Sequence, residues 1–215
     1  MSIYRLTGRF LDESTYIVSK DGVCLVIDPG ADASEILSFC EGKGICIQAV
    51  LLTHAHVDHI YGAAALSKLG YPIYLHADDA ELLNGRGNLA LVFGLKLEII
   101  EKYRTFEGER STVDLDPFIV EVIHTPGHTA GSVCYLIEGD LFSGDTLFAD
   151  SYGRTDLPTG DEQDLICSIA NELFELPPET FVYAGHSQFA GGKNEAQNDT
   201  TIGEERICNP ISELI

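Results

Sequence analysis

The sequence predicts an α/β (α+β) fold made of two halves, each combining a β-sheet with helices, with the sheets packed between the helices. Short apolar strands alternate with helix-like segments, and this alternation appears twice within the 215 residues. The run over 49–52 is continuously apolar, as expected for a strand in a sheet that is buried on both faces. Histidines and aspartates directly follow several strands, at the edge where open α/β sheets bind ligands.

The first half is expected to contain four short strands and two helices. The strands cover 16–19, 23–27, 49–52 and 72–75, and the helices cover 34–41 and 60–69. Asp28-Pro29-Gly30 ends the second strand, and Gly44 and Gly70 follow the two helices, because glycine readily adopts the left-handed backbone that closes a helix. The segment 84–110 shows no pattern that predicts a structure.

The second half repeats this organisation with four strands and one clear helix. The strands cover 118–123, 132–137, 141–143 and 180–183. The helix covers 161–173, where Leu165, Ile169 and Leu173 recur at helical spacing before Pro177 and Pro178 end it. We expect residues 1–215 to form a single domain, since this length supports one substantial core.

Composition narrows the possible partners and the location. The 34 Asp and Glu against 13 Lys and Arg give a formal net charge of -21, so nucleic acid is excluded as a partner on electrostatic grounds. The six cysteines form no C-x-x-C pair and no disulfide framework. The N-terminus has no apolar leader pattern, and no stretch approaches 18 apolar residues. We therefore expect no membrane association and a cytoplasmic location.

The stretch from Thr53 to His59 places four potential metal ligands within six residues, immediately after the buried strand 49–52. These ligands are His54, His56, Asp58 and His59. Side chains two positions apart on an extended backbone can converge on one point, and neutral imidazole and carboxylate are preferred ligands of zinc and similar cations. The pattern predicts a metal site with more than one cation position.

Three further candidate ligands stand beyond the ends of strands in the second half. His128 lies in the loop after 118–123, Asp145 follows 141–143, and His186 follows 180–183. A single histidine after a strand is usually structural. Four strand ends that deliver His or Asp to one edge of the sheets together predict a shared metal centre.

These residues resemble the metallo-β-lactamase superfamily, and within it the hydroxyacylglutathione hydrolases, known as glyoxalase II. The matching motifs are T-H-x-H-x-D-H at 53–59, T-P-G-H-T at 125–129, S-G-D-T-L-F at 143–148, G-R-T-D at 153–156 and Gly185-His186. The resemblance covers nearly the whole chain. It implies a four-layer αββα sandwich with a binuclear metal site.

Carried over by position, the resemblance implies one metal held by His54, His56 and His128, a second held by Asp58, His59 and His186, and Asp145 bridging them. Zinc is expected, with iron or manganese as alternatives because the same ligands bind them. Two such cations lower the pKa of a shared water and polarise a carbonyl, so we expect hydroxide to attack the acyl carbon of a thioester small molecule. Asp58 would orient this nucleophile while it ligates.

Other activities stay open. Asp145 disfavours a true β-lactamase, and His186 favours a hydrolase over the persulfide dioxygenases, which bind a single iron. A hydrolase of another ester or a lactone fits the same ligands. A non-catalytic metal-binding scaffold is least favoured, because all seven ligands are present. The oligomeric state cannot be inferred.

Contacts to the substrate are predicted from fewer signals. Arg154 is a candidate anchor for a substrate carboxylate, and Tyr152 is a candidate pocket residue. The polar segment 188–199, which includes Lys193, separates His186 from the T-T-I-G-E-E run and is either a lid that supplies a positive charge or a solvated loop. The sequence therefore leaves open whether the substrate contains glutathione.

Overall fold

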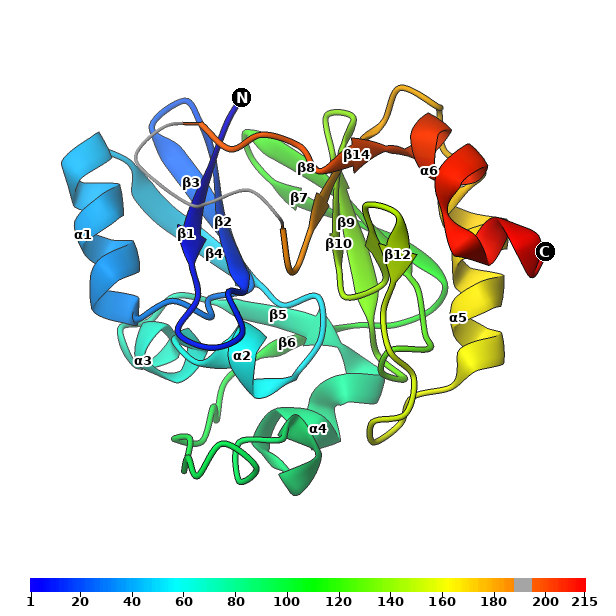
Figure 1. Cartoon of the computed structure of the whole chain (residues 1–215). Helices are drawn as coiled ribbons and strands as arrows, with labels where there is room; N and C mark the ends of the chain where they lie inside the picture. The colour runs from blue at the N-terminus through cyan, green and yellow to red at the C-terminus, as the bar shows by residue number, and fades with distance from the viewer. Residues whose placement is uncertain (188–194) are drawn as a thin grey trace.

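The computed structural model describes residues 1–187 and 195–215, and the described chain contains two six-stranded sheets that face each other (Figure 1). The first sheet, in spatial order, consists of β1 (Ser2–Thr7), β2 (Ser14–Lys20), β3 (Val23–Ile27), β4 (Cys46–Leu51), β5 (Ile73–His76) and β6 (Arg104–Phe106). The second consists of β14 (Thr200–Thr201), β13 (Phe181–Ala184), β10 (Asp140–Gly144), β9 (Val133–Ile137), β8 (Phe118–His124) and β7 (Arg110–Leu115). A small hairpin of β11 (Leu147–Phe148) and β12 (Ser151–Tyr152) follows β10.

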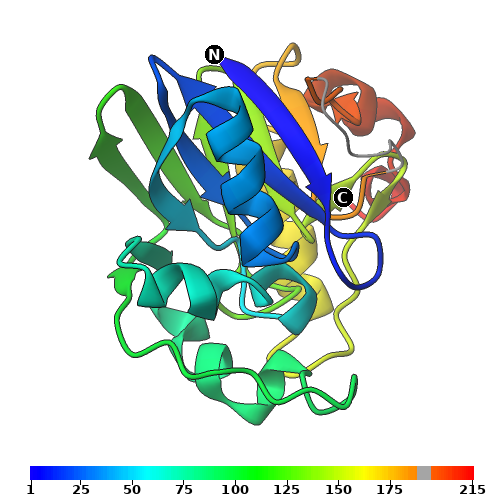
Figure 2. The ribbon, with the colours of Figure 1, turned by 90° about the vertical axis from the view of Figure 1, so that its left-hand side faces the viewer.

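Helices cover the outer faces of both sheets. The helices of the described chain are α1 (Ala33–Lys43), α2 (Val57–Ile60), α3 (Ala63–Lys68), α4 (Ala80–Asn84), α5 (Glu162–Ser168) and α6 (Ile202–Cys208). Short 3-10 turns occur at Ala77–Asp79, Arg86–Asn88 and Pro210–Glu213. In Figure 1, α1 lies on one side of the paired sheets and α5 and α6 lie on the other. Figure 2 looks onto α1, which crosses the outer face of the first sheet.

Three hydrophobic clusters hold these four layers together. The cluster between the sheets includes the fully buried rings of Tyr16, Phe118, Tyr135 and Phe142. A second cluster packs α1 and α3 onto the first sheet, and a third packs α5 and α6 onto the second sheet. Aromatic rings bury the largest apolar areas, so the interface between the sheets is the central core. The predicted αββα sandwich is confirmed.

Strand direction brings several strand ends to one edge of the sandwich. β3, β4, β5 and β6 are parallel neighbours in the first sheet. In the second sheet β10 is parallel to β13, and both β8 and β10 are antiparallel to β9, so β8 and β10 run in the same direction. The carboxyl ends of β4, β8, β10 and β13 are the points after which the candidate ligands occur. The shared strand direction therefore places the candidate ligands at one edge of the sandwich.

The helix expected over 60–69 is divided into α2 and α3, with Tyr61 and Gly62 between them. The backbone N–H of Gly62 donates to the carbonyl of Pro29 at 2.7 Å, and a Cβ at Gly62 would lie 2.6 Å from the carbonyl oxygen of Ala31. The chain therefore packs closely against the turn that follows β3. The helix expected over 161–173 is present, with α5 continuing into a π-helical turn at Ile169–Leu173.

The sequence patterns did not predict β1, β6, β7, β11, β12 or β14. In β7, exposed residues alternate with half-buried ones, so the strand carries too little apolar signal to stand out. The unassigned segment 84–110 holds the Arg86–Asn88 turn, an irregular stretch and β6. Within residues 1–187 and 195–215, every helix is too short or too polar to span a bilayer.

Candidate metal centre

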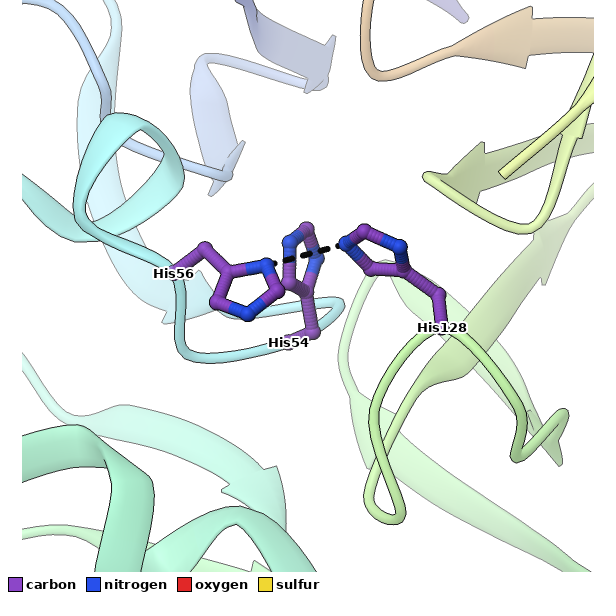
Figure 3. A group of neighbouring side chains, drawn as sticks. All are labelled: His54, His56 and His128. Carbon is purple, nitrogen blue, oxygen red and sulfur yellow. Dashed lines mark hydrogen bonds between the residues drawn. The ribbon is translucent and has the colours of Figure 1, made fainter. Parts of the chain in front are cut away.

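The loop after β4 and the short helix α2 carry the first four candidate ligands. His54 and His56 lie on the loop, and both Asp58 and His59 are buried in α2. His128 comes from the loop after β8. Figure 3 shows the rings of His54, His56 and His128 turned toward one another from these two loops, with Nδ1 of His56 2.9 Å from Nε2 of His128. Ligand atoms of the three side chains lie within 4.8 Å of one another.

A second group lies beside the first and draws on α2 and on the end of β13. It consists of Asp58, His59 and His186, whose ligand atoms also lie within 4.8 Å of one another. Nε2 of His186 is 3.5 Å from Oδ2 of Asp58 and 3.4 Å from Nε2 of His59. The structure therefore brings together both triplets of side chains that the sequence resemblance implies.

Asp145, at the end of β10, lies between the two groups. Its carboxylate oxygens are 3.3 Å from Nε2 of His59, 3.5 Å from Nε2 of His128 and 3.5 Å from Nε2 of His186. Gly185 permits this approach, because a Cβ there would lie 2.4 Å from Oδ1 of Asp145. One carboxylate thus contacts members of both triplets.

Electrostatics leave His54, His56 and Asp145 in the protonation states that suit metal ligands. Burial and the neighbouring histidines lower the pKa of His54 well below its usual value, and burial and His128 lower the pKa of His56 to about 3, so both rings are neutral. Burial alone would raise the pKa of Asp145, but His59 and His186 hold it well below its usual value. Asp145 is therefore ionised, and His54 and His56 are neutral imidazoles with free lone pairs.

The second nitrogen of each of four ligand histidines is engaged by the protein. The contacts are His54 Nδ1 to Thr53 Oγ1 at 3.1 Å, His59 Nδ1 to Asp28 Oδ2 at 3.0 Å, His128 Nδ1 to the Arg154 carbonyl at 2.8 Å and His186 Nδ1 to the Leu11 carbonyl at 3.0 Å. Such contacts orient the ring and leave Nε2 facing the centre. In contrast, His56 turns Nδ1 toward His128.

Two buried aspartates, Asp28 and Asp79, to which the sequence analysis gave no role in the site, support the ligand loops. Asp28 accepts hydrogen bonds from the N–H and hydroxyl of Thr53 as well as from His59. Asp79 accepts from the N–H of Ala55 at 2.8 Å and from the hydroxyl of Thr129 at 2.9 Å. Both follow strands of the first sheet, so the strand-end rule that selected Asp145 could also have found them.

The donor set fits bound metal. Nε2 of His54, which faces the centre, is buried and finds no hydrogen-bond partner within the described part of the protein. A buried polar atom without a partner is costly, and a lone pair directed at a cation removes that cost. Borderline cations such as zinc or iron prefer this combination of imidazole and carboxylate.

A cavity of about 520 Å³ opens beside the candidate ligands. Arg154 lines it, and its guanidinium pairs with both carboxylate oxygens of Asp156 at 2.7 and 2.8 Å. Tyr152 instead packs against the hydrophobic cluster of the second sheet and does not line the cavity. Lys193, the third predicted substrate contact, lies outside the described residues together with most of the segment 188–199.

The chain is similar in sequence to proteins that are named as hydrolases. The chain is 36% identical over 184 residues to the "Probable metallo-hydrolase YqgX" of Bacillus subtilis, an alignment that covers 82% of this chain and 85% of the relative. It is 34% identical over 192 residues to "Hydroxyacylglutathione hydrolase GloC" of Haemophilus influenzae, covering 86% of this chain and 85% of that protein.

Two solved structures superimpose over almost the full chain. The BLEG-1 B3 metallo-beta-lactamase matches with a TM-score of 0.83 and 31% identity, covering 97% of this chain and 98% of that one. TTHA1623, solved in a di-iron-bound form, matches with a TM-score of 0.80 and 35% identity, covering 96% and 98%. The profile of the metallo-beta-lactamase superfamily matches residues 8–186. The chain is therefore a hydrolase-type member of the metallo-beta-lactamase superfamily, whose fold binds divalent metals.

Proposed function

We propose that this protein is a binuclear metal-dependent hydrolase that cleaves thioesters. The observation that carries the proposal is the position of Asp145, whose two carboxylate oxygens lie 3.3 to 3.5 Å from imidazole nitrogens of both ligand triplets. A shared carboxylate of this kind favours two cations held close together. The similarity to the hydroxyacylglutathione hydrolase GloC supports a thioester as the bond that is cleaved.

The proposed ligands are His54, His56 and His128 for one cation and Asp58, His59 and His186 for the other, with Asp145 shared. Zinc is the first candidate, and the similarity to the di-iron form of TTHA1623 supports iron as an alternative. Bound there, the two cations would activate water and polarise an acyl carbonyl.

The protein's own side chains position the reactants. Asp58 lines the cavity and would orient the attacking water through its carboxylate. Burial raises the pKa of Cys134 to about 12, so this thiol is protonated and is no nucleophile. None of the described cavity-lining residues is Ser or Cys, which favours attack by water over a covalent acyl-enzyme.

The test measures hydrolysis of S-lactoylglutathione by protein loaded with zinc or iron, as the loss of thioester absorbance. The metal content per chain is measured on the same protein. Asp145→Asn should keep the fold, lower the metal content and abolish turnover. Asp156→Asn, at an exposed aspartate, is the matched control and should retain both metals. Turnover that survives in Asp145→Asn, or a single metal in the active protein, would contradict the binuclear proposal.

A second candidate is β-lactam hydrolysis, which the similarity to BLEG-1 favours. The same metal-loaded preparation should be offered a chromogenic cephalosporin beside the thioester. A kcat/KM for the cephalosporin that exceeds every thioester value would replace the thioesterase proposal. The fold and the metal centre would be unaffected by that result.

A further inference from the structure

We propose that the physiological substrate carries an aliphatic acyl chain, and that the loop around Leu89, Val92 and Phe93 binds this chain beside the metal centre. This inference rests on the proposed thioester hydrolysis and specifies its substrate class. It follows from the chemistry of the cavity wall, from the exposure of its rim and from the backbone that presents it.

Apart from the candidate metal ligands and Arg154, the described wall of the cavity is apolar. The apolar members are Leu11, Leu89, Val92, Phe93, Phe148 and Leu157. They come from the β1–β2 loop, the segment after α4, β11 and the segment after β12, so four separate parts of the chain contribute. A pocket with apolar walls and polar groups gathered at one end suits an apolar chain with a reactive polar head.

The rim of this wall is exposed to an unusual degree for large apolar side chains. Leu11 is 62% exposed, Val92 is 77% exposed and Phe93 is 37% exposed. The ring centroids of Phe93 and Phe10 lie 5.5 Å apart, so the segment after α4 packs against the β1–β2 loop. Contiguous exposed apolar surface rimmed by polar residues often marks a ligand-binding groove.

Two of the six apolar side chains stand on left-handed backbone. Leu11 has a φ of 55° and Leu89 a φ of 65°. Glycine or asparagine adopts this conformation with less strain than leucine does. Strained backbone concentrates at ligand-binding sites, and in both cases the strained residue presents an isobutyl group to the cavity.

The charge around the cavity disfavours glutathione as the recognised group. Glutathione carries two carboxylates, and Arg154 is the sole Lys or Arg side chain among the described lining residues. Its guanidinium is already paired in a bidentate contact with Asp156. The described lining therefore offers an acyl chain a large apolar surface, and it offers the two carboxylates of glutathione a single guanidinium that is already paired.

The experiment compares kcat/KM for acetyl, butanoyl, hexanoyl, octanoyl and decanoyl thioesters of N-acetylcysteamine with that for S-lactoylglutathione. Loss of thioester absorbance is followed instead of thiol release, because Cys46, Cys167 and Cys208 are exposed and would react with thiol reagents. We expect kcat/KM to rise about fourfold per buried methylene up to octanoyl. Octanoyl should exceed lactoylglutathione.

Variants of the wall residues test whether the dependence of kcat/KM on acyl chain length arises at the proposed wall. Leu89→Asn replaces a strained leucine with a residue that tolerates this backbone, so it should not unfold the protein. Both Leu89→Asn and Val92→Ser should lower the octanoyl-to-acetyl ratio of kcat/KM about tenfold. The matched control is Ile207→Ser on α6, an exposed apolar residue outside the cavity, which should leave the ratio unchanged.

A binding measurement separates this inference from the thioesterase proposal. Calorimetry with the non-hydrolysable S-octyl and S-butyl thioethers of N-acetylcysteamine should show at least tenfold tighter binding of the octyl compound, weakened in Val92→Ser. If the thioesters are hydrolysed at rates that do not depend on chain length, and the two thioethers bind equally, the acyl-chain inference is wrong and the thioesterase proposal still holds. Chain-length-dependent binding without thioester turnover would support the apolar site and reject the thioesterase proposal.

Discussion

Oδ2 of Asp28 lies 3.0 Å from Nδ1 of His59, and both side chains are completely or almost completely buried. The same carboxylate holds the N–H and the hydroxyl of Thr53 at 2.7 and 2.6 Å. One aspartate after β3 therefore orients a ligand histidine on α2 and the first residue of the ligand loop after β4.

Replacing Asp28 with Asn should weaken metal binding without removing any ligand. Asparagine tolerates the φ of 48° at this position, so the backbone is retained, but the amide cannot accept from both His59 and Thr53 as the carboxylate does. We expect a loss of about 10- to 100-fold in metal affinity. Competition with a chromogenic chelator measures it, and wild-type affinity in Asp28→Asn would contradict the positioning role.

Gly185→Ala should displace the carboxylate of Asp145. The added Cβ would lie 2.4 Å from Oδ1 of Asp145 and 2.7 Å from Cε1 of His59, closer than heavy atoms approach in proteins. We expect fewer than two metals per chain and at least about a 100-fold loss of kcat/KM, in the range typical when catalytic positioning is disturbed.

The control for that variant is Gly42→Ala. Gly42 lies within α1, and a Cβ there meets no other atom within 4 Å. Alanine should raise the free energy of unfolding by about 0.5–1 kcal/mol and leave the metal content unchanged. Equal metal content in Gly185→Ala and Gly42→Ala would show that the close approach at Gly185 is unimportant.

Asp79→Ala should destabilise the whole fold as well as the site. The buried carboxylate joins Ala55 in the first ligand loop to Thr129 and to the N–H of Gly131 beside His128. Loss of these contacts should cost about 3 kcal/mol, since bonds to a charged group are the stronger kind. The midpoint temperature of thermal unfolding should be well below that of the exposed control Asp78→Ala. Equal midpoints in the two variants would show that Asp79 does not stabilise the two ligand loops.

Metal uptake should release protons at neutral pH. Burial alone would lower the pKa of His186, but Asp145 and Asp58 raise it to about 10, and Asp145 and Asp58 likewise raise the pKa of His59 against the effect of burial. His186 is therefore protonated in the metal-free protein at pH 7.5 and must lose a proton to ligate, and the raised pKa of His59 acts in the same direction. Calorimetry in buffers of different ionisation enthalpy should report at least about one proton released per chain.

The sign of the accompanying stability change follows from the same shifts. A raised folded-state pKa means that the contribution of His59 and His186 to metal-free stability is complete below their unfolded value of about 6.5. For His186 it is lost as the pH rises toward about 10. The free energy of unfolding of the metal-free protein should therefore be lower at pH 9 than at pH 6.5. The additional stabilisation by bound metal should increase over the same pH range.

Particular elements show how far sequence patterns extend. The strands at 23–27 and 118–123 were predictable because continuous or alternating apolar residues mark buried strands whatever surrounds them. β7 and β14 were not, since their strand geometry comes from pairing with β8 and β13 and not from apolar content. The division of the 60–69 helix depended on the close contact of Gly62 with Pro29 and Ala31, which are about 30 positions away.

By itself the sequence determined the alternation of strands and helices and the types of ligand that follow the strands, because both are local properties of residue order. Only the tertiary structure decided which ligand atoms meet: Asp145 contacts both triplets because β8, β10 and β13 run in one direction in a sheet packed against β4. The supporting aspartates, Asp28 and Asp79, and the apolar cavity wall also depend on contacts between distant segments. No local pattern encodes those contacts, since they exist only once the two sheets have packed.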